Sequence, residues 1–242
     1  MNEKNNSHAD TRARRRARLN VLIACEESQA ECMAFRNLGH NAFSCDIQKC
    51  RYNPDWHILG DVTPLLQGQT KFTTQSGVQM SVPRWDLIIC HPPCTYLCKV
   101  SSPLLVSRKY EKPQGDSWYY SVSEDVWINS DRYRKLRRAR DFFMLCLNAQ
   151  APYVAVENPL PMARAELPKP SCYICPSWFG VKYTKKTLYW LKNLPPIVAN
   201  LEYPNPKCFV TSSRGKYRSR TFPEVAKAIA EQWSRYILDD SR

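Results

Sequence analysis

The first motif with side chains that could do chemistry is Asp86-Leu-Ile-Ile-Cys-His-Pro-Pro-Cys94, an apolar run that leads into two prolines and a thiol. Prolines stiffen the chain and donate no ladder hydrogen bond, so they would hold Cys94 just past the end of a buried strand. A rigidly presented thiol is a candidate nucleophile. A buried structural cysteine fits the same residue type, so this motif alone leaves both roles open.

The second motif is Glu157-Asn158-Pro159, which directly follows the apolar run Tyr153–Val156. If both runs are strands of one parallel sheet, their carboxyl ends meet at the edge where such sheets bind ligands. Glu157 and Cys94 would then share a site. His91 could tune the thiol or donate to a phosphate, although a structural histidine is an equally open interpretation.

The elements that must position these residues are short apolar runs separated by helical patterns. Three helices are predicted. The first begins at the capping box Ser28-Gln-Ala-Glu31 and ends at Gly39, the second begins at Arg132, and the third begins at Thr221-Phe-Pro-Glu224. Strands that alternate with helices predict the α/β class: a Rossmann-like, mostly parallel sheet with helices on both faces. The predicted strands are 19–24, 42–45, 56–61, 85–90, 153–156 and 187–191.

Three segments stand outside this pattern. Residues 1–18 end in five arginines within seven positions and are predicted to be a flexible basic arm, with 19–242 forming the domain. Residues 66–84 are a polar insertion that could form a hairpin. Residues 100–130 carry prolines, a glycine and aromatic residues without a regular period and are predicted to be a long mobile loop.

The charge balance indicates the class of partner. Lys and Arg total 35 against 22 Asp and Glu, which leaves a net charge of +13 in 242 residues and favours nucleic acid. No apolar run approaches the ~20 residues of a membrane span. No apolar stretch precedes the arginines, so we expect no membrane partner and a cytoplasmic location.

The 11 cysteines are expected to be mostly buried, reduced thiols, because their number is odd and several lie in apolar segments. Cys172-x-x-Cys175 could be half of a zinc site. Only Cys208 and no histidine follows it, and two ligands do not complete a tetrahedral site, so no metal is expected.

Over about residues 20–235 the chain resembles the DNA (cytosine-5) methyltransferases, in particular small proteins of this type from phages and prophages. Its motifs occur in the family's order. They are Pro93-Cys94, Glu157-Asn158 with Pro159 in place of valine, Phe179-Gly180-Val181 with Leu188-Tyr189, and Pro223 with Val225 and Ala226.

The resemblance implies an S-adenosylmethionine-dependent methyltransferase fold and a cofactor site. Asp46 would bind the ribose hydroxyls and Asp61, in Gly60-Asp61-Val62, the adenine amino group. The implied cofactor-binding residues are Glu26, Ser28, Asp46, Ile47, Asp61, Val62 and Pro93. The location would be the cytoplasm of a bacterium or of a phage-infected cell.

The implied reaction is methyl transfer to C5 of a cytosine that has left the duplex stack. Cys94 would add to C6 while Glu157 holds or protonates N3. Loss of the C5 proton and elimination would then free the thiol. The substrate-binding residues would be His91, Asn158, Lys185, Lys186, Thr187, Arg218 and Arg220.

Three departures from the family pattern keep a second function open. The first loop, Ala24-Cys25-Glu26-Glu27-Ser28, has no glycine. The family's Gln-x-Arg-x-Arg motif aligns with Tyr183, Lys185 and Thr187, so both of its arginines are replaced here. The target-recognition region is reduced to about 193–219, where basic residues suit phosphate contact better than base readout.

The alternative function is a non-catalytic nucleic-acid-binding protein that retains the methyltransferase fold. A third candidate is an amino-methyltransferase, whose site has an aromatic residue where this chain has Cys94.

Overall fold

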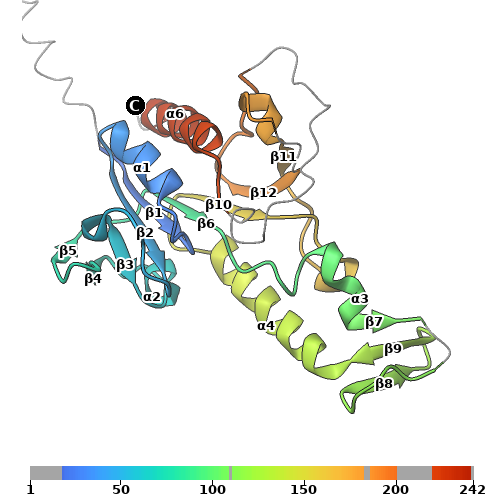
Figure 1. Ribbon diagram of the computed structural model, residues 1–242. Coiled ribbons are helices and arrows are strands. Elements are labelled where there is room, and N and C mark those ends of the chain that lie inside the picture. The colour runs from blue at the N-terminus through green and yellow to red at the C-terminus, as the bar shows by residue number, and fades with distance from the viewer. Residues whose placement is uncertain (1–17, 109–110, 183–185, 201–219, 241–242) are drawn as a thin grey trace, which may run out of the picture.

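The computed structural model describes residues 18–108, 111–182, 186–200 and 220–240. Its centre is a seven-stranded sheet in the order β11-β12-β10-β6-β1-β2-β3 (Figure 1). Five strands run parallel, and β12 runs antiparallel to both of its neighbours. The strands are β1 (Asn20–Ala24), β2 (Asn41–Asp46), β3 (His57–Leu59), β6 (Leu87–Cys90), β10 (Tyr153–Asn158), β11 (Cys172–Ile174) and β12 (Thr187–Lys192).

Helices cover both faces of this sheet, as the sequence predicts. On one face, α1 (Ala30–Asn37) and α6 (Pro223–Asp240) pack against each other and on Val21 and Ile23 of β1. On the other face, α4 (Ser130–Leu147) and α2 (Thr63–Leu66) cover Leu22. Successive β1 side chains thus enter two separate cores, which is the pattern of a strand buried on both sides.

The predicted strands and helices occur within a few residues of their expected bounds. The hairpin expected in 66–84 is present as β4 (Lys71–Thr73) and β5 (Gln79–Ser81). The short edge strand β11 was not predicted. Single turns of helix complete the chain: η1 (Pro54–Trp56), η2 (Lys99–Ser101), α3 (Ser102–Leu105), η3 (Ala163–Ala165) and η4 (Pro176–Phe179).

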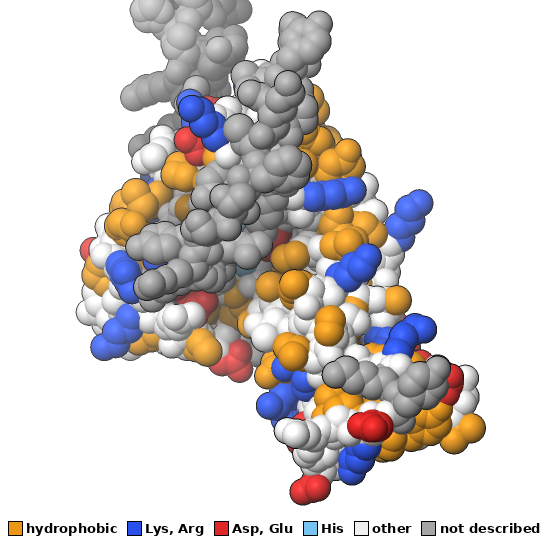
Figure 2. Space-filling view, turned by 45° about the vertical axis from the view of Figure 1, so that its right-hand side comes forward, with side chains coloured by type: hydrophobic (Ala, Val, Ile, Leu, Met, Phe, Trp, Pro, Cys, Tyr) orange, Lys and Arg blue, Asp and Glu red, His pale blue; other side chains and the backbone are white. Residues whose placement is uncertain are grey.

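The prediction of a long mobile loop over residues 100–130 is wrong. The segment contains a three-stranded antiparallel sheet of β7 (Val106–Ser107), β8 (Trp118–Ser121) and β9 (Val126–Asn129), in the order β7-β9-β8. Buried Val126 and Ile128 join this sheet to the core that also contains Leu136 of α4. Together with the first turns of α4 it projects from the main sheet (Figure 1) and shows hydrophobic side chains and charges of both signs (Figure 2).

Two further expectations concern the whole chain. The ten cysteines within the described residues form no disulfide with one another, and six of them are buried. In the same residues, no helix has the length and apolar character needed to cross a bilayer. Residues 1–17 of the predicted arm at 1–18, and residues 201–219 of the predicted reduced recognition region at 193–219, lie outside the described residues.

Candidate active site

The predicted nucleophile lies in a tight turn after the central strand β6. The His91 N–H donates to the Ala24 carbonyl at 2.9 Å, which extends the pairing of β6 with β1 by one residue. Two prolines follow, and the Cys94 carbonyl then accepts the N–H groups of Leu97 and Cys98, both at 3.0 Å. The Cys94 side chain is partly buried. The two prolines and the turn thus present the thiol at the carboxyl edge of the sheet, as predicted.

Glu157 and Asn158 lie in the last two positions of β10, the parallel neighbour of β6. The Asn158 side chain is fully buried and that of Glu157 is 16% exposed. One oxygen of each side chain, Oε1 of Glu157 and Oδ1 of Asn158, is buried and accepts no hydrogen bond from the described residues. Buried acceptors normally have a donor, so these two atoms are candidates for ligand contact.

The segments that follow β6 and β10 are bonded to each other. The Lys99 N–H donates to the Leu160 carbonyl and the Met162 N–H donates to the Leu97 carbonyl, both at 2.8 Å. These two bonds flank an antiparallel bridge between Cys98 and Pro161. The turn containing Cys94 and the chain following Glu157 are therefore held side by side at one edge of the sheet.

His91 does not face solvent as a phosphate-binding residue would. Its Nε2 lies 3.2 Å from Oε2 of Glu31 in α1, and its Nδ1 lies 3.5 Å from Oε2 of Glu157. Burial lowers the pKa of His91, but the charges of Glu31 and Glu157 outweigh this effect and raise the pKa well above its usual value. The imidazolium is thus the form that this site favours, and the histidine joins the two motifs to helix α1.

The first loop has no glycine, and two other residues there adopt left-handed backbone conformations. Cys25 has φ 60° and Gln29 has φ 56°, conformations that usually require glycine. The predicted capping box is wrong, because Gln29 is the N-cap and the Glu26 carboxylate accepts the N–H groups of Glu31 at 2.8 Å and Cys32 at 3.3 Å. Glu31 is free of the capping role and instead points inward to His91.

Glu26 is almost fully buried in this loop. Burial, followed by the charge of Glu31, raises the pKa of Glu26 from 4.5 to about 7. Because both oxygens of its carboxylate accept backbone N–H groups at the start of α1, the Glu26 side chain caps this helix. Sequence inspection alone misses this role because Glu26 precedes the predicted capping box.

The acidic residues predicted for the cofactor lie at adjacent strand ends. Asp46 closes β2 and Asp61 follows β3, and the Gly60 N–H donates to the Asp46 carbonyl at 3.0 Å. Each carboxylate accepts the N–H two residues later, from Gln48 at 2.8 Å and from Thr63 at 2.9 Å. The Glu26 N–H donates to the Cys45 carbonyl at 3.2 Å, so the end of β2, where Asp46 lies, is beside the first loop.

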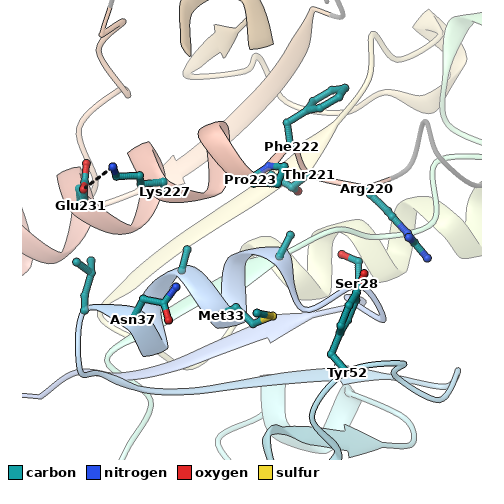
Figure 3. Close-up of a pocket in the computed structure, with 13 residues that line it drawn as sticks. Ser28, Met33, Asn37, Tyr52, Arg220, Thr221, Phe222, Pro223, Lys227 and Glu231 are labelled. Carbon is teal, nitrogen blue, oxygen red and sulfur yellow. Dashed lines mark ion pairs between the residues drawn. The ribbon is translucent and has the colours of Figure 1, made fainter. Parts of the chain in front are cut away.

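The remaining candidates for the cofactor divide between exposed, buried and peripheral positions. Ile47 is 80% exposed next to Asp46, whereas Val62 is buried at the start of α2. Pro93 is exposed beside Cys94. Ser28 lines an open groove of about 750 Å³ between α1 and α6, together with Tyr52 and Arg220 (Figure 3).

The predicted substrate-binding residues are only partly brought together. Thr187 and Arg220 line a small cavity beside Glu157, whereas the exposed Lys186 places its ammonium group over the Tyr173 ring at 4.0 Å. The Arg220 guanidinium donates to Oε1 of Glu27 at 3.1 Å, so it contacts the first loop. Lys185 and Arg218 lie outside the described residues.

The cavity beside Glu157 measures about 30 Å³ and is also lined by Tyr189 and Thr221. Its volume is about that of one water molecule. The Thr221 hydroxyl donates to Oε1 of Glu31 at 3.1 Å, which ties the start of α6 to the same network. Glu31, Tyr189 and Thr221 were not predicted as site residues.

No protein-family model and no curated protein matches this chain. Within the described residues, no group of three or more His, Cys, Asp or Glu side chains is placed to hold a metal ion. The candidate active site therefore rests on its own geometry: a thiol, a carboxylate pair around a histidine, and two aspartates along one edge of the sheet.

Proposed function

We propose that the protein transfers a methyl group from S-adenosylmethionine to C5 of cytosine in DNA through a covalent adduct at Cys94. The observation that carries this proposal is the pair of 2.8 Å hydrogen bonds that holds the Cys94 turn beside the chain following Glu157. A nucleophile and a hydrogen-bonding carboxyl group fixed at adjacent strand ends can act on one pyrimidine ring from two sides.

The sheet order supports the corresponding fold. Numbered along the chain, its five parallel strands follow the 3-2-1-4-5 order of doubly wound nucleotide-binding sheets, with the order reversing between β1 and β6. Ligands bind such sheets at the carboxyl ends next to this reversal. Cys25 at the end of β1 and Cys94 after β6 flank that position.

The residues near β2 and β3 fit the chemistry of an adenosyl group. Asp46 and Asp61 offer carboxylates to hydroxyl and amino donors, and the exposed Ile47 offers an apolar surface to a ring. When bound, S-adenosylmethionine would supply an electrophilic methyl group. The chain's own contribution there is to bind and orient, since two carboxylates on adjacent strands fix two sets of donors at once.

The chemical steps then follow from Cys94 and Glu157. The thiolate sulfur forms a bond to C6, and the electron pair of the C5–C6 double bond moves to C5, which becomes nucleophilic enough to accept the methyl group. Oε1 of Glu157, which has no donor within the described residues, can hold the protonated N3 of the ring. A solvent water then takes the C5 proton, the electron pair of that C–H bond restores the C5–C6 double bond, and the Cys94 sulfur leaves C6 as a thiolate.

A cationic pair beside the Cys94 turn supports DNA as the substrate. The Arg132 guanidinium lies 5.0 Å and the Lys135 ammonium 5.8 Å from the centre of the Tyr96 ring, two residues after Cys94. Neither has a carboxylate partner among the described residues, whereas Arg134 and Arg137 on the same helix are ion-paired. A guanidinium stacked on an aromatic ring keeps its N–H edge available for phosphate.

Trapping with 5-fluorocytosine tests the reaction. The C5 fluorine cannot leave as a proton does, so incubation of the protein with fluorocytosine-containing DNA and cofactor should give a denaturation-resistant adduct, mapped to Cys94 by mass spectrometry. Cys94→Ser should abolish it. Cys175→Ser is the matched control, because Cys175 is also partly buried and lies in the turn after β11. Absence of an adduct and of labelled methyl transfer with the wild-type protein would refute the proposal.

The small volume of the cavity beside Glu157 favours a second candidate, a nucleic-acid-binding protein that retains this fold without catalysis. This cavity of about 30 Å³ is too small for a pyrimidine and Cys94 is not among the residues that line it, so catalysis requires the site to open between Cys94 and Glu157. Calorimetry separates the two functions. DNA binding without any measurable heat of S-adenosylmethionine binding would favour the non-catalytic protein.

A further inference from the structure

The His91 imidazole lies between two carboxylates that come from opposite directions. Glu31 reaches its Nε2 from helix α1 at 3.2 Å, and Glu157 reaches its Nδ1 from strand β10 at 3.5 Å. The side chains of Glu31, His91 and Glu157 are 0%, 13% and 16% exposed. Each ring nitrogen therefore faces one carboxylate in surroundings that exclude most water.

The charges in this network require a cation at its centre. A fully buried carboxylate such as Glu31 is costly unless it is paired and hydrogen-bonded. Its Oε1 accepts the Thr221 hydroxyl at 3.1 Å, and the only cation within 4 Å of it among the described residues is His91. Nε2 of His91 and Oε2 of Glu31 have no hydrogen-bond partner among the described residues, so their 3.2 Å contact is an ion pair that only the protonated imidazole can form.

The other groups that face the network are the acid Glu26, the neutral Tyr189 and the arginine Arg220, which is already paired. Glu26 lies beneath the first loop, and its pKa is raised to about 7 by burial and by Glu31. Tyr189 of β12 is fully buried, and its pKa is raised well above the usual value by burial and by the charges of Glu31 and Glu157. Arg220 is paired with Glu27 at 3.1 Å. The surroundings thus stabilise the protonated form of His91.

We propose that Glu31 and protonated His91 are positioning residues that fix the Glu157 carboxylate and place a positive charge beside it. His91 engages Oε2 of Glu157, which leaves the buried Oε1 as the oxygen directed to the substrate ring. This inference rests on the proposed function. It adds that helix α1, which carries neither motif, helps to set the geometry of the reaction through a residue that resembles an ordinary helix cap in the sequence.

Histidine NMR tests the charge of the network without substrate. The chain has only four histidines, and His57 is a useful internal contrast: it is buried, contacts Ser44 and the Gln48 carbonyl, and has its pKa lowered by burial. In a pH titration of the labelled protein, the resonance lost in His91→Gln should titrate at the highest pH of the four. In Glu31→Gln the same resonance should titrate at lower pH than in the wild type, because one of its two carboxylates is neutral.

Kinetics tests the positioning role. Glu31→Gln keeps the size of the side chain and an acceptor for Thr221, and should lower kcat for methyl transfer by up to about 100-fold with little change in KM for DNA. The decline of activity at high pH should also move to lower pH, since His91 loses its proton earlier. His57→Gln, the control for loss of a buried histidine, should leave this pH profile unchanged.

Two results would overturn the inference. One is a His91 resonance that titrates with the other histidines in the wild type. The other is that, with an active wild type, both Glu31→Gln and His91→Gln have the same kcat and the same pH profile as the wild type. Failure of the wild type to transfer any methyl group would instead refute the proposed function, because the NMR titration is measured without cofactor or DNA.

Discussion

At the residue scale, the main cost in this site is the burial of three carboxyl groups around one histidine. Glu26 is 5% exposed and its carboxylate accepts two backbone N–H groups at the start of α1. Burial and the charge of Glu31 nevertheless raise its pKa from 4.5 to about 7. The folded protein thus binds a proton at Glu26 more tightly than the unfolded chain does between these two pH values.

This shift predicts how stability depends on pH. Because the folded-state pKa is raised, the contribution of Glu26 is fully present below about pH 4.5 and is lost as the pH rises to about 7, by an amount on the order of 3 kcal/mol. His91, whose pKa is also raised, adds a further decline at higher pH. Urea unfolding of Glu26→Gln should show a smaller loss of stability between pH 4.5 and 7 than the wild type. Exposed Glu111→Gln should match the wild type, and parallel curves for Glu26→Gln and the wild type would contradict the prediction.

The sequence predicts those site residues whose position depends on the local chain. Cys94 follows two prolines at the end of a buried strand, and Asp46 and Glu157 lie at the ends of two other strands. Because parallel strands end at the same edge of a sheet, the sequence predicts that all three residues share that edge. Glu31 could not be predicted in the same way. Its role depends on His91, 60 positions away in the sequence, and its spacing from Ser28 matches a capping box equally well.

At the element scale, the projection formed by β7, β9 and β8 is the largest difference from the sequence-based expectation. Its strands have two to four residues, and β8 is open to solvent, with Tyr119 and Tyr120 45% and 44% exposed. Short strands with one weakly buried face carry no clear alternation. The sheet is stabilised through Val126 and Ile128, which join the core around α4, and such long-range contacts are not encoded in a local pattern.

Helix α4 allows a test of the phosphate contact within one element. Arg132→Ala and Lys135→Ala should each weaken DNA binding several-fold. Each should also reduce the magnitude of the slope of log affinity against log salt by about 1. The reason is that each substitution removes one cation that has no carboxylate partner among the described residues. Arg134→Ala is the matched control, since Arg134 lies on the same helix but pairs with Asp131 at 3.3 Å. Fluorescence anisotropy with labelled DNA at several salt concentrations measures both quantities. Equal effects of all three substitutions would show that α4 contributes only general charge.

At the scale of the whole molecule, the sheet joins residues from both ends of the described chain at one edge. The antiparallel strand β12 lies between β10 and β11, and the chain then reaches α6, which packs on α1. Thr221 thereby bonds Glu31 and Arg220 bonds Glu27 across about 190 residues of sequence. Periodicity predicts β10, β12, α1 and α6, but neither β11 nor the insertion of β12 between β10 and β11. The contacts of Thr221 and Arg220 therefore become visible only in the assembled fold.

The net charge of +13 predicts the salt dependence of DNA binding by the entire chain. Each phosphate neutralised by Lys or Arg releases counterions, so affinity should fall on the order of a thousandfold between 50 and 200 mM salt if about six phosphates are contacted. Deleting residues 1–17, which include four arginines, should weaken binding and flatten this dependence. Replacing Arg12, Arg14, Arg15 and Arg16 with glutamine keeps the length and should reproduce most of the effect. Affinity that is the same at low and high salt would rule out phosphate contact as the basis of binding, whatever the chemistry at Cys94.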